Sequence, residues 1–172
     1  MFVAFGDKKE LLMFLDKTAF VLTFLATLGA GLIAGVFFIF SIAIMRALER
    51  VPGGMAAMQS MNVAVPNPMF LGVFLGTGLV CLVLAIFSVV NWERTGAMWI
   101  LAAALLYLIG AIGITVVFNV PMNNALNAAD PSSPAGQELW KNYLANWTFW
   151  NHVRTIASLG ATATFMAGLV MR

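Results

Sequence analysis

The chain has 172 residues, of which 62% are hydrophobic and 9% are charged, and its formal net charge is +2. Soluble domains carry about 25% charged residues, so this composition excludes a water-soluble globular protein. It predicts an all-helical integral membrane protein with a single domain over residues 1–172.

Residue counts exclude several kinds of site and partner. The single cysteine, Cys81, excludes an internal disulfide, and we interpret it as an inert side chain in an apolar run. With one cysteine and one histidine, a Cys/His zinc site and two-histidine haem ligation are both excluded. The nine basic residues of a membrane protein mostly set its orientation, so we expect no nucleic-acid partner.

Four apolar segments predict a four-transmembrane-helix bundle. We expect the spans at about residues 18–45, 69–90, 97–118 and 147–171. A tight polar turn at Trp92-Glu93-Arg94 joins the second span to the third. The first long loop is expected to hold a short amphipathic helix between Pro52-Gly53-Gly54 and Pro66-Asn67-Pro68. The fourth span is expected to follow a more polar helix that starts near Ser133.

The basic residues predict the orientation. On the side of both termini lie Lys8, Lys9, Lys17, Arg94 and Arg172, and on the other side lie Arg46, Arg50, Lys141 and Arg154. If Arg46 and Arg154 are buried in a site, five basic residues remain on the side of the termini and two on the other side. The excess of positive charge then places both termini in the cytoplasm. We therefore expect a protein of the bacterial inner membrane whose polar site faces the non-cytoplasmic side.

Small residues recur at helical spacing in the first two spans. Gly31 with Gly35, and Gly72 with Gly76, are four residues apart, and such pairs let helix backbones approach closely. We interpret them as packing sites within the bundle. A homo-oligomer that assembles through either pair is the alternative.

The fourth span contains the most informative pattern in the chain. From Asn142 to Met171 the only formal charge is Arg154. Ionisable groups inside a membrane helix are costly and usually face a bundle interior or a wet cavity. The residues that share its face at helical spacing are Trp147, Asn151 and Ser158, with His152 and Thr155 placed beside them. This stripe predicts the functional face of the helix.

Polar residues of other elements are expected at the same depth as Arg154. They are Arg46, Gln59, Asn62, Asn119, Asn123, Asn151 and His152, and Thr115 continues the stripe of the third helix. Aromatic and sulfur side chains crowd the same end, among them Trp140, Tyr143, Trp147, Trp150 and Met122. Such walls suit a small, planar, lipophilic ligand whose polar atoms are held by amides and Arg154. The alternative is an interfacial belt of aromatic residues with arginines that extend to the membrane surface.

Four sequence strings carry a resemblance to a known family. They are Ala57-Met-Gln-Ser-Met-Asn62, Asn67-Pro-Met-Phe70, Val117-Phe-Asn-Val-Pro-Met-Asn-Asn-Ala-Leu126 and Trp150-Asn-His-Val-Arg-Thr155. Their order and spacing resemble the anthrone-oxygenase-like family of small four-helix membrane proteins, over about residues 15–169. That family usually has Met-Pro-Ala-Leu after its first span, whereas this chain has Arg46 in place of the proline.

The resemblance implies oxidation of an anthrone to an anthraquinone by O₂ without a cofactor. An anthrone that loses a proton beside its carbonyl becomes an electron-rich anion, so the protein would need a base, oxyanion donors and a dry, flat pocket. Histidine titrates nearest to neutral pH, which makes His152 the expected base. The expected oxyanion donors are Arg154, Asn119 and Asn151, and the expected substrate contacts are Trp147, Trp150, Asn123, Asn62, Gln59 and Met122.

Other functions fit the same polar layer. A non-catalytic membrane module could bind a lipid or quinone there, or support a partner protein. A transporter is a weaker alternative, because four spans without an internal repeat or a midplane charge offer little for a pathway. A metal stays an alternative only as a haem held by His152 or an ion shared with Glu49, Asp130 and Glu138.

Overall fold

The computed structural model describes residues 8–171, and every regular element in that range is a helix. Four helical rods are long and apolar enough to cross a membrane, which confirms the predicted four-helix architecture. The rods cover Lys9–Arg50, Pro68–Val90, Ala97–Ala128 and Pro134–Val170. Arg172, which was expected to mark the cytoplasmic surface, lies outside the described residues.

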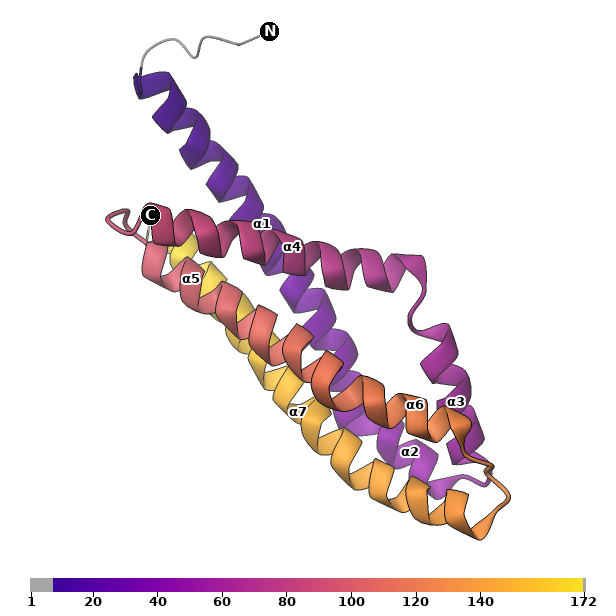
Figure 1. The fold of residues 1–172 in the computed structure, drawn as a ribbon. Coiled ribbons are helices and arrows are strands. Elements are labelled where there is room, and N and C mark those ends of the chain that lie inside the picture. Colours follow the sequence, from indigo (N-terminus) through magenta and orange to yellow (C-terminus); the bar gives the residue numbers. More distant parts are fainter. Residues whose placement is uncertain (1–7, 172) are drawn as a thin grey trace, which may run out of the picture.

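The first rod is a continuous helix that is longer than the predicted span. It consists of α1 (Lys8–Ile39), the π-helical segment η1 (Phe40–Ile44) and α2 (Met45–Arg50). We expected this helix over residues 18–45, but no proline occurs before Pro52, so the helix continues at both ends. In Figure 1 the beginning of α1 projects beyond the other rods.

The first long loop contains the predicted short helix, α3 (Gly54–Ala64). Beyond it, Pro66-Asn67-Pro68 breaks the chain and starts the second rod, α4 (Pro68–Val90). The side chain of Asn67 accepts a hydrogen bond of 3.0 Å from the backbone nitrogen of Phe70, which satisfies one free N–H group of the first turn. This capped breaker turns α4 away from α3 (Figure 1).

The third rod runs ten residues beyond the predicted end at residue 118. It consists of α5 (Ala97–Leu105), two π-helical segments, η2 (Leu106–Gly113) and η3 (Thr115–Asn119), and α6 (Val120–Ala128). Pro121 was expected to bend this helix, and it lies in the first turn of α6, directly after η3. Segment η3 changes the backbone hydrogen-bond register just before Pro121, which has no N–H group to donate.

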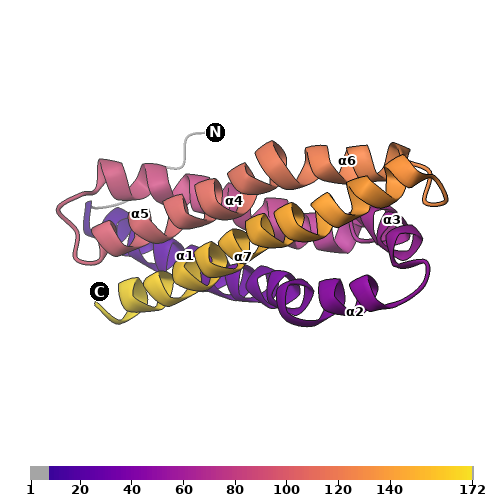
Figure 2. The same cartoon turned by 90° about the horizontal axis from the view of Figure 1, so that it is seen from below.

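The fourth rod is one helix, α7 (Pro134–Val170), which joins the predicted polar helix to the fourth span. Ser133 caps it by accepting a hydrogen bond of 3.0 Å from the backbone nitrogen of Gly136. Helix α7 lies beside the rod of α5 and α6 in Figure 1 and crosses α1 obliquely in Figure 2. It contacts both the first and the third rods, as α4 also does.

The interior divides into two apolar clusters along the bundle. The larger, around Phe74, Tyr107 and Phe165, joins all four rods. The second lies at the end where α2, α3 and α6 meet α7, and it includes Met58, Leu126, Trp140, Tyr143 and Trp147. Large aliphatic side chains such as Leu32, Leu79 and Ile109 are exposed on the outside of the rods, as expected for a surface in contact with lipid.

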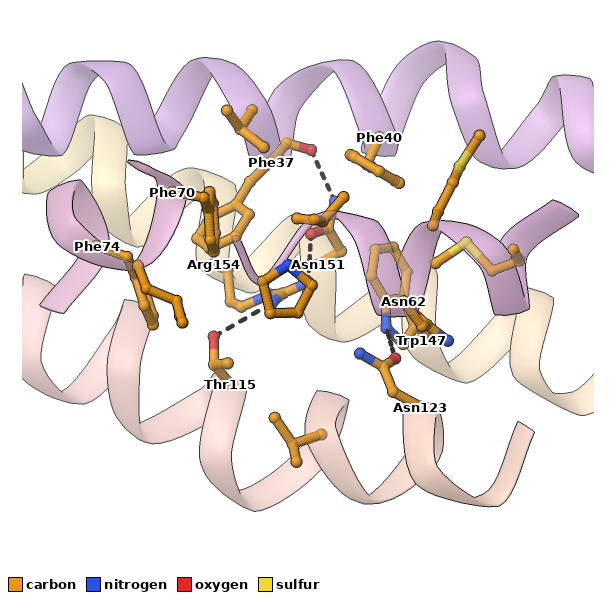
Figure 3. Close-up of a pocket in the computed structure, with 17 residues that line it drawn as sticks. Phe37, Phe40, Asn62, Phe70, Phe74, Thr115, Asn123, Trp147, Asn151 and Arg154 are labelled. Atoms are coloured by element: carbon orange, nitrogen blue, oxygen red, sulfur yellow. Dashed lines mark hydrogen bonds between the residues drawn. The ribbon is translucent and has the colours of Figure 1, made fainter. Parts of the chain in front are cut away.

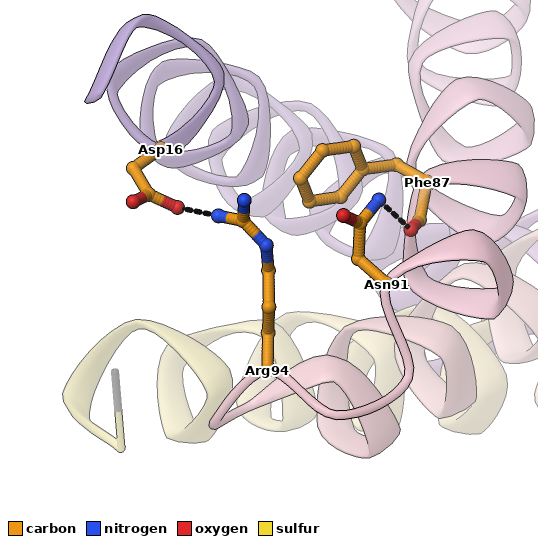
Figure 4. A network of polar contacts seen from close by, with 4 residues as sticks. All are labelled: Asp16, Phe87, Asn91 and Arg94. Atoms are coloured by element: carbon orange, nitrogen blue, oxygen red, sulfur yellow. Dashed lines mark hydrogen bonds and ion pairs between the residues drawn. The ribbon is translucent and has the colours of Figure 1, made fainter. Parts of the chain in front are cut away.

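An ion pair joins α1 to the turn between α4 and α5, at the end of the bundle away from the second apolar cluster (Figure 4). Arg94, in the turn between α4 and α5, donates from Nη1 to Asp16 of α1. The guanidinium carbon of Arg94 also lies 5.6 Å from the centre of the Phe87 ring. Because the Asp16 carboxylate is largely exposed, the pair itself adds little stability, and its main effect is to fix where α1 crosses this turn.

The glycine pairs do not act as the sequence suggested. A Cβ atom added at Gly31 would approach Thr162 of α7 at 3.7 Å, whereas Gly35, Gly72 and Gly76 face open space. Interpreting Gly72 and Gly76 as packing sites within the bundle is therefore wrong. The close helix contacts occur elsewhere, for example at Gly110, where an added Cβ would collide with the side chain of Ala157.

Replacing Gly110 by leucine should destabilise the bundle, because the larger side chain would force the third rod and α7 apart. Overpacking of this kind costs about 1–3 kcal/mol, so Gly110→Leu should lower the melting temperature in detergent by several degrees. The matched substitution Gly76→Leu should leave the melting temperature almost unchanged, since no atom lies within 4 Å of its added Cβ. Equal losses in the two variants would contradict this packing.

Candidate functional site

Arg154 lies inside the bundle with only 5% of its surface exposed. Its Nη1 atom donates to Thr115 Oγ1 at 3.1 Å, and its Nη2 atom donates to Asn151 Oδ1 at 2.6 Å. The guanidinium carbon lies 4.2 Å from the centre of the Phe37 ring and 5.1 Å from that of Trp147. Within residues 8–171, no carboxylate pairs with Arg154, and its Nε–H donates to no acceptor. A buried positive charge is therefore held by neutral groups alone.

Asn151 fixes the guanidinium through contacts with the first rod. Its Nδ2 atom donates to the carbonyl oxygen of Phe37 and to Ser41 Oγ, each at 2.7 Å. Ser41 lies in η1, and its hydroxyl is also 3.3 Å from Thr155 Oγ1. Both N–H groups of the amide are thus engaged inside the protein, and its oxygen is free to accept from Arg154. This network joins α1, η1 and α7 around the charge.

A pocket of about 170 Å³ opens beside the guanidinium (Figure 3). Its walls are mainly apolar, and their aromatic members are Phe37, Phe40, Phe70, Phe74 and Trp147. Its polar groups are Thr115, Asn151 and Arg154 together with Asn62 and Asn123. An aromatic cavity with a few convergent polar groups is the usual form of a small-molecule site.

The rim of the pocket is apolar and exposed. Pro66 lies in the linker before α4, Leu71 lies on α4, and Val120 begins α6. All three side chains are exposed on the outside of the bundle. Leu71 and Val120 lie on helices that are long and apolar enough to cross a membrane, and Pro66 lies in the linker next to one of them.

Asn123 forms a second polar group in this pocket. Its Oδ1 atom accepts a hydrogen bond of 2.8 Å from the hydroxyl of Tyr143 and one of 2.7 Å from Trp147 Nε1. Asn62, on α3, lies at the same end of the pocket in Figure 3, and its Nδ2 atom donates to Asn127 Oδ1 at 3.2 Å. The structure thus gathers five of the predicted residues around one cavity: Asn62, Asn123, Trp147, Asn151 and Arg154.

His152 is not among the residues that line the pocket. It is exposed on the outside of α7, whereas Asn151 and Arg154 are buried. Successive residues of an α-helix differ by about 100°, so His152 and Arg154, two positions apart, point to nearly opposite sides. Placing His152 beside the stripe was wrong, and helical geometry already showed this.

Other predicted residues support the site from outside the cavity. Asn119 is buried and donates from Nδ2 to the carbonyl oxygen of Trp147 at 3.3 Å. Gln59 donates to the carbonyl oxygens of Leu126 and Ala129 at 2.8 and 2.9 Å, which caps the end of α6. These contacts join neighbouring helices and leave neither side chain on the cavity wall.

Three more predicted residues lie away from the pocket. Trp150 stacks on Phe118, with 3.6 Å between ring centres, and Met122 packs against the apolar cluster that includes Trp140. Arg46 is exposed, so it does not join the polar layer that we predicted. Among residues 8–171, no three histidine, cysteine, aspartate or glutamate side chains come together, so Glu49, Asp130, Glu138 and His152 do not form a cluster.

Several residues of the site were not identified from the sequence. Phe37, Phe40, Phe70 and Phe74 occur in uniformly apolar spans, where nothing distinguishes a wall residue from one that faces lipid. Ser41 gave a usable signal, because it is the only polar side chain between Thr27 and Arg46. An isolated hydroxyl at the depth of Arg154 indicates a hydrogen-bonding role.

Replacing Arg154 and replacing Asn151 should have different effects on the stability of the protein. Arg154→Met removes a buried charge that lacks a counter-ion, so the melting temperature in detergent should stay the same or rise. Asn151→Leu removes the acceptor of Arg154 Nη2 and one of the two hydrogen-bond partners of Ser41. The unpaired buried N–H should cost about 1–3 kcal/mol and lower the melting temperature by several degrees. If Arg154→Met were as destabilising as Asn151→Leu, Arg154 would be a structural residue.

Comparison with known proteins identifies the family. The family model described as anthrone oxygenase matches residues 68–164, which is more than half of the chain. This segment contains Thr115, Asn123, Trp147, Asn151 and Arg154, and the α1 side of the pocket lies before it. Comparison with curated proteins and with solved structures gives no match. The protein belongs to the anthrone oxygenase family.

Proposed function

We propose that the protein uses O₂ to oxidise a planar, lipophilic aromatic molecule in the cavity beside Arg154, which we name the Arg154 pocket. The observation that carries this proposal is the buried guanidinium, which has no carboxylate partner among residues 8–171 and lies against aromatic walls. An anionic form of the substrate would supply the missing counter-charge. Family membership supports an anthrone-like or quinol-like substrate.

The reaction of an anthrone-like substrate needs only O₂ and the loss of a proton. Removal of the proton from the CH₂ carbon leaves a carbanion whose charge is delocalised onto the carbonyl oxygen. O₂ takes this electron pair to form the new C–O bond, and protonation gives a hydroperoxide. Loss of water from the hydroperoxide gives the ketone, so one oxygen atom enters the product and the other leaves as water.

The residues of the pocket have distinct roles in this proposal. Arg154 stabilises the oxyanion of the ionised substrate through N–H groups of its guanidinium. Thr115 and Asn151 position the guanidinium, because their hydrogen bonds fix both of its terminal nitrogens. The N–H groups of Asn151 are already engaged, so we assign it this positioning role instead of the predicted donor role. The aromatic walls exclude water.

The position of the opening supports entry from the bilayer. The exposed rim of Pro66, Leu71 and Val120 is apolar, so a lipophilic substrate would reach the pocket without crossing water. With Arg154 buried and Arg46 exposed, the sequence assigns five basic residues to the side of the termini and three to the side of the pocket. This asymmetry favours cytoplasmic termini and a pocket toward the non-cytoplasmic side.

A binding module without catalysis is the second candidate. Arg154 is the only ionisable residue that lines the described pocket, so no side chain there is an obvious general base. In the oxygenase proposal, the field of Arg154 favours the ionised substrate, and the proton passes to water at the exposed rim, outside the aromatic walls. In the alternative, the pocket holds a quinone or an anionic lipid that does not react.

Turnover of emodin anthrone in detergent discriminates between these functions. The wild-type protein should accelerate O₂ consumption and quinone formation above the spontaneous rate, and Arg154→Met should reduce the enzymatic rate on the order of 100- to 1,000-fold. The matched control Arg46→Met removes an exposed arginine and should retain the wild-type rate. A folded wild-type protein that gives no acceleration would contradict the oxygenase proposal for this class of substrate.

His152→Ala should retain turnover within about twofold, because this side chain is outside the pocket. The rate should be measured across pH 6–9, since loss of a general base would change the shape of the pH profile. A variant that loses activity while its melting temperature is unchanged would restore the predicted role of His152 as the base.

A further inference from the structure

We propose that the Arg154 pocket recognises two oxygen atoms on opposite edges of one planar ring system. An ionised oxygen binds at Arg154, and a second, neutral oxygen accepts a hydrogen bond from the amide nitrogen of Asn123. This inference rests on the proposed function only in using the same pocket, and it defines the class of molecule that the pocket selects.

The orientation of the Asn123 amide is fixed by its two neighbours. The indole Nε1 of Trp147 can only donate a hydrogen bond, so the atom of Asn123 that lies 2.7 Å from it must be the oxygen. The hydroxyl of Tyr143 donates to the same oxygen at 2.8 Å. The Nδ2 atom must therefore point elsewhere, and in Figure 3 it points toward the side of the pocket that holds Thr115.

The two N–H bonds of the Asn123 amide are available to a ligand. Asn123 lines the pocket, and within residues 8–171 no acceptor takes a hydrogen bond from its Nδ2 atom. Its oxygen carries two hydrogen bonds, which hold the amide plane in place while the nitrogen stays free. A donor that is fixed by the protein but unpaired in an aromatic cavity is suited to a ligand oxygen.

Trp147 sets the distance between the two recognition groups. The guanidinium of Arg154 lies over the face of its ring, 5.1 Å from the centre, while Asn123 is bonded to its Nε1 edge. The ring is buried and packed against Tyr143 and Phe40, each with 5.8 Å between ring centres. One immobilised indole thus separates the cation from the neutral donor, a spacing suited to oxygens on opposite edges of a ring or of two fused rings.

This arrangement predicts selection against ligands with a single polar edge. A fatty acid or a simple aromatic acid could pair with Arg154 but would cover the N–H groups of Asn123 with hydrocarbon. A buried donor left unpaired weakens binding, so a site built to donate a hydrogen bond discriminates against an analogue that lacks the acceptor. The preferred ligands are planar aromatics with one acidic oxygen and a carbonyl or ether oxygen across the ring system.

The test is binding of two naphthoates that differ in one atom. In 6-methoxy-2-naphthoate an ether oxygen lies across the rings from the carboxylate, and in 6-ethyl-2-naphthoate a CH₂ group replaces that oxygen. Both are anionic at neutral pH and neither has the reactive carbon of an anthrone. An absence of anthrone turnover would therefore not affect the binding comparison. Equal binding of the two naphthoates would likewise leave the oxygenase proposal to its own turnover assay. Affinities would be measured by calorimetry in the same detergent.

The wild-type protein should bind the methoxy compound about tenfold more tightly than the ethyl compound. In Asn123→Asp the carboxylate still accepts from Tyr143 and Trp147 but offers no N–H group, so the preference should disappear. Asn124→Asp is the matched control, because it adds the same charge at the neighbouring exposed residue, and it should retain the preference.

Three results would overturn the proposal. The first is equal binding of both naphthoates by the wild-type protein. This result does not depend on whether any variant folds. The second is retention of the preference in Asn123→Asp. The third is the absence of binding by either compound to folded wild-type protein.

Discussion

The buried positive charge of Arg154 is the constraint on which the arrangement of this end of the molecule depends. Burying a guanidinium costs several kcal/mol unless other groups replace its hydration. Thr115 and Asn151 accept its hydrogen bonds, and the faces of Phe37 and Trp147 provide favourable electrostatics. No carboxylate within residues 8–171 completes the neutralisation. In our account the ligand supplies that charge.

The π-helical segments align the groups that surround this charge. Thr115 and Asn123 are eight residues apart, so a regular α-helix would offset their side chains by about 80°. Segment η3 (Thr115–Asn119) lies between them, and its wider turns reduce this offset, so that both residues reach one cavity. Segment η1 similarly contains Ser41, which holds the amide of Asn151. Such segments are frequent at functional sites, and here they explain how straight membrane helices can converge on one small pocket.

Sequence patterns predicted the architecture and part of the site. Uncharged runs are sufficient to locate four membrane helices, and an isolated charge in the fourth is sufficient to identify Arg154 as buried. Patterns fail where the result depends on contacts between helices: the sequence did not show that Asn151 uses both N–H groups on α1, or that Gly72 and Gly76 face open space. The π-helical segments could not be predicted either, because they change which residues share a face. The misplacement of His152 is different, since the helical angle from Arg154 already excluded it.

The most direct test of the central claim is the ionisation state of a bound chromophore. Emodin changes its absorption spectrum when a phenolic group ionises, so its pKa can be titrated in the complex without O₂ or turnover. If the ligand supplies the counter-charge of Arg154, wild-type protein should lower the pKa of bound emodin below its value in detergent micelles. Arg154→Met should remove this shift, because the remaining apolar surroundings favour the neutral form. A pKa that is unchanged or raised in the wild-type complex would contradict the claim that this pocket is built for an anion.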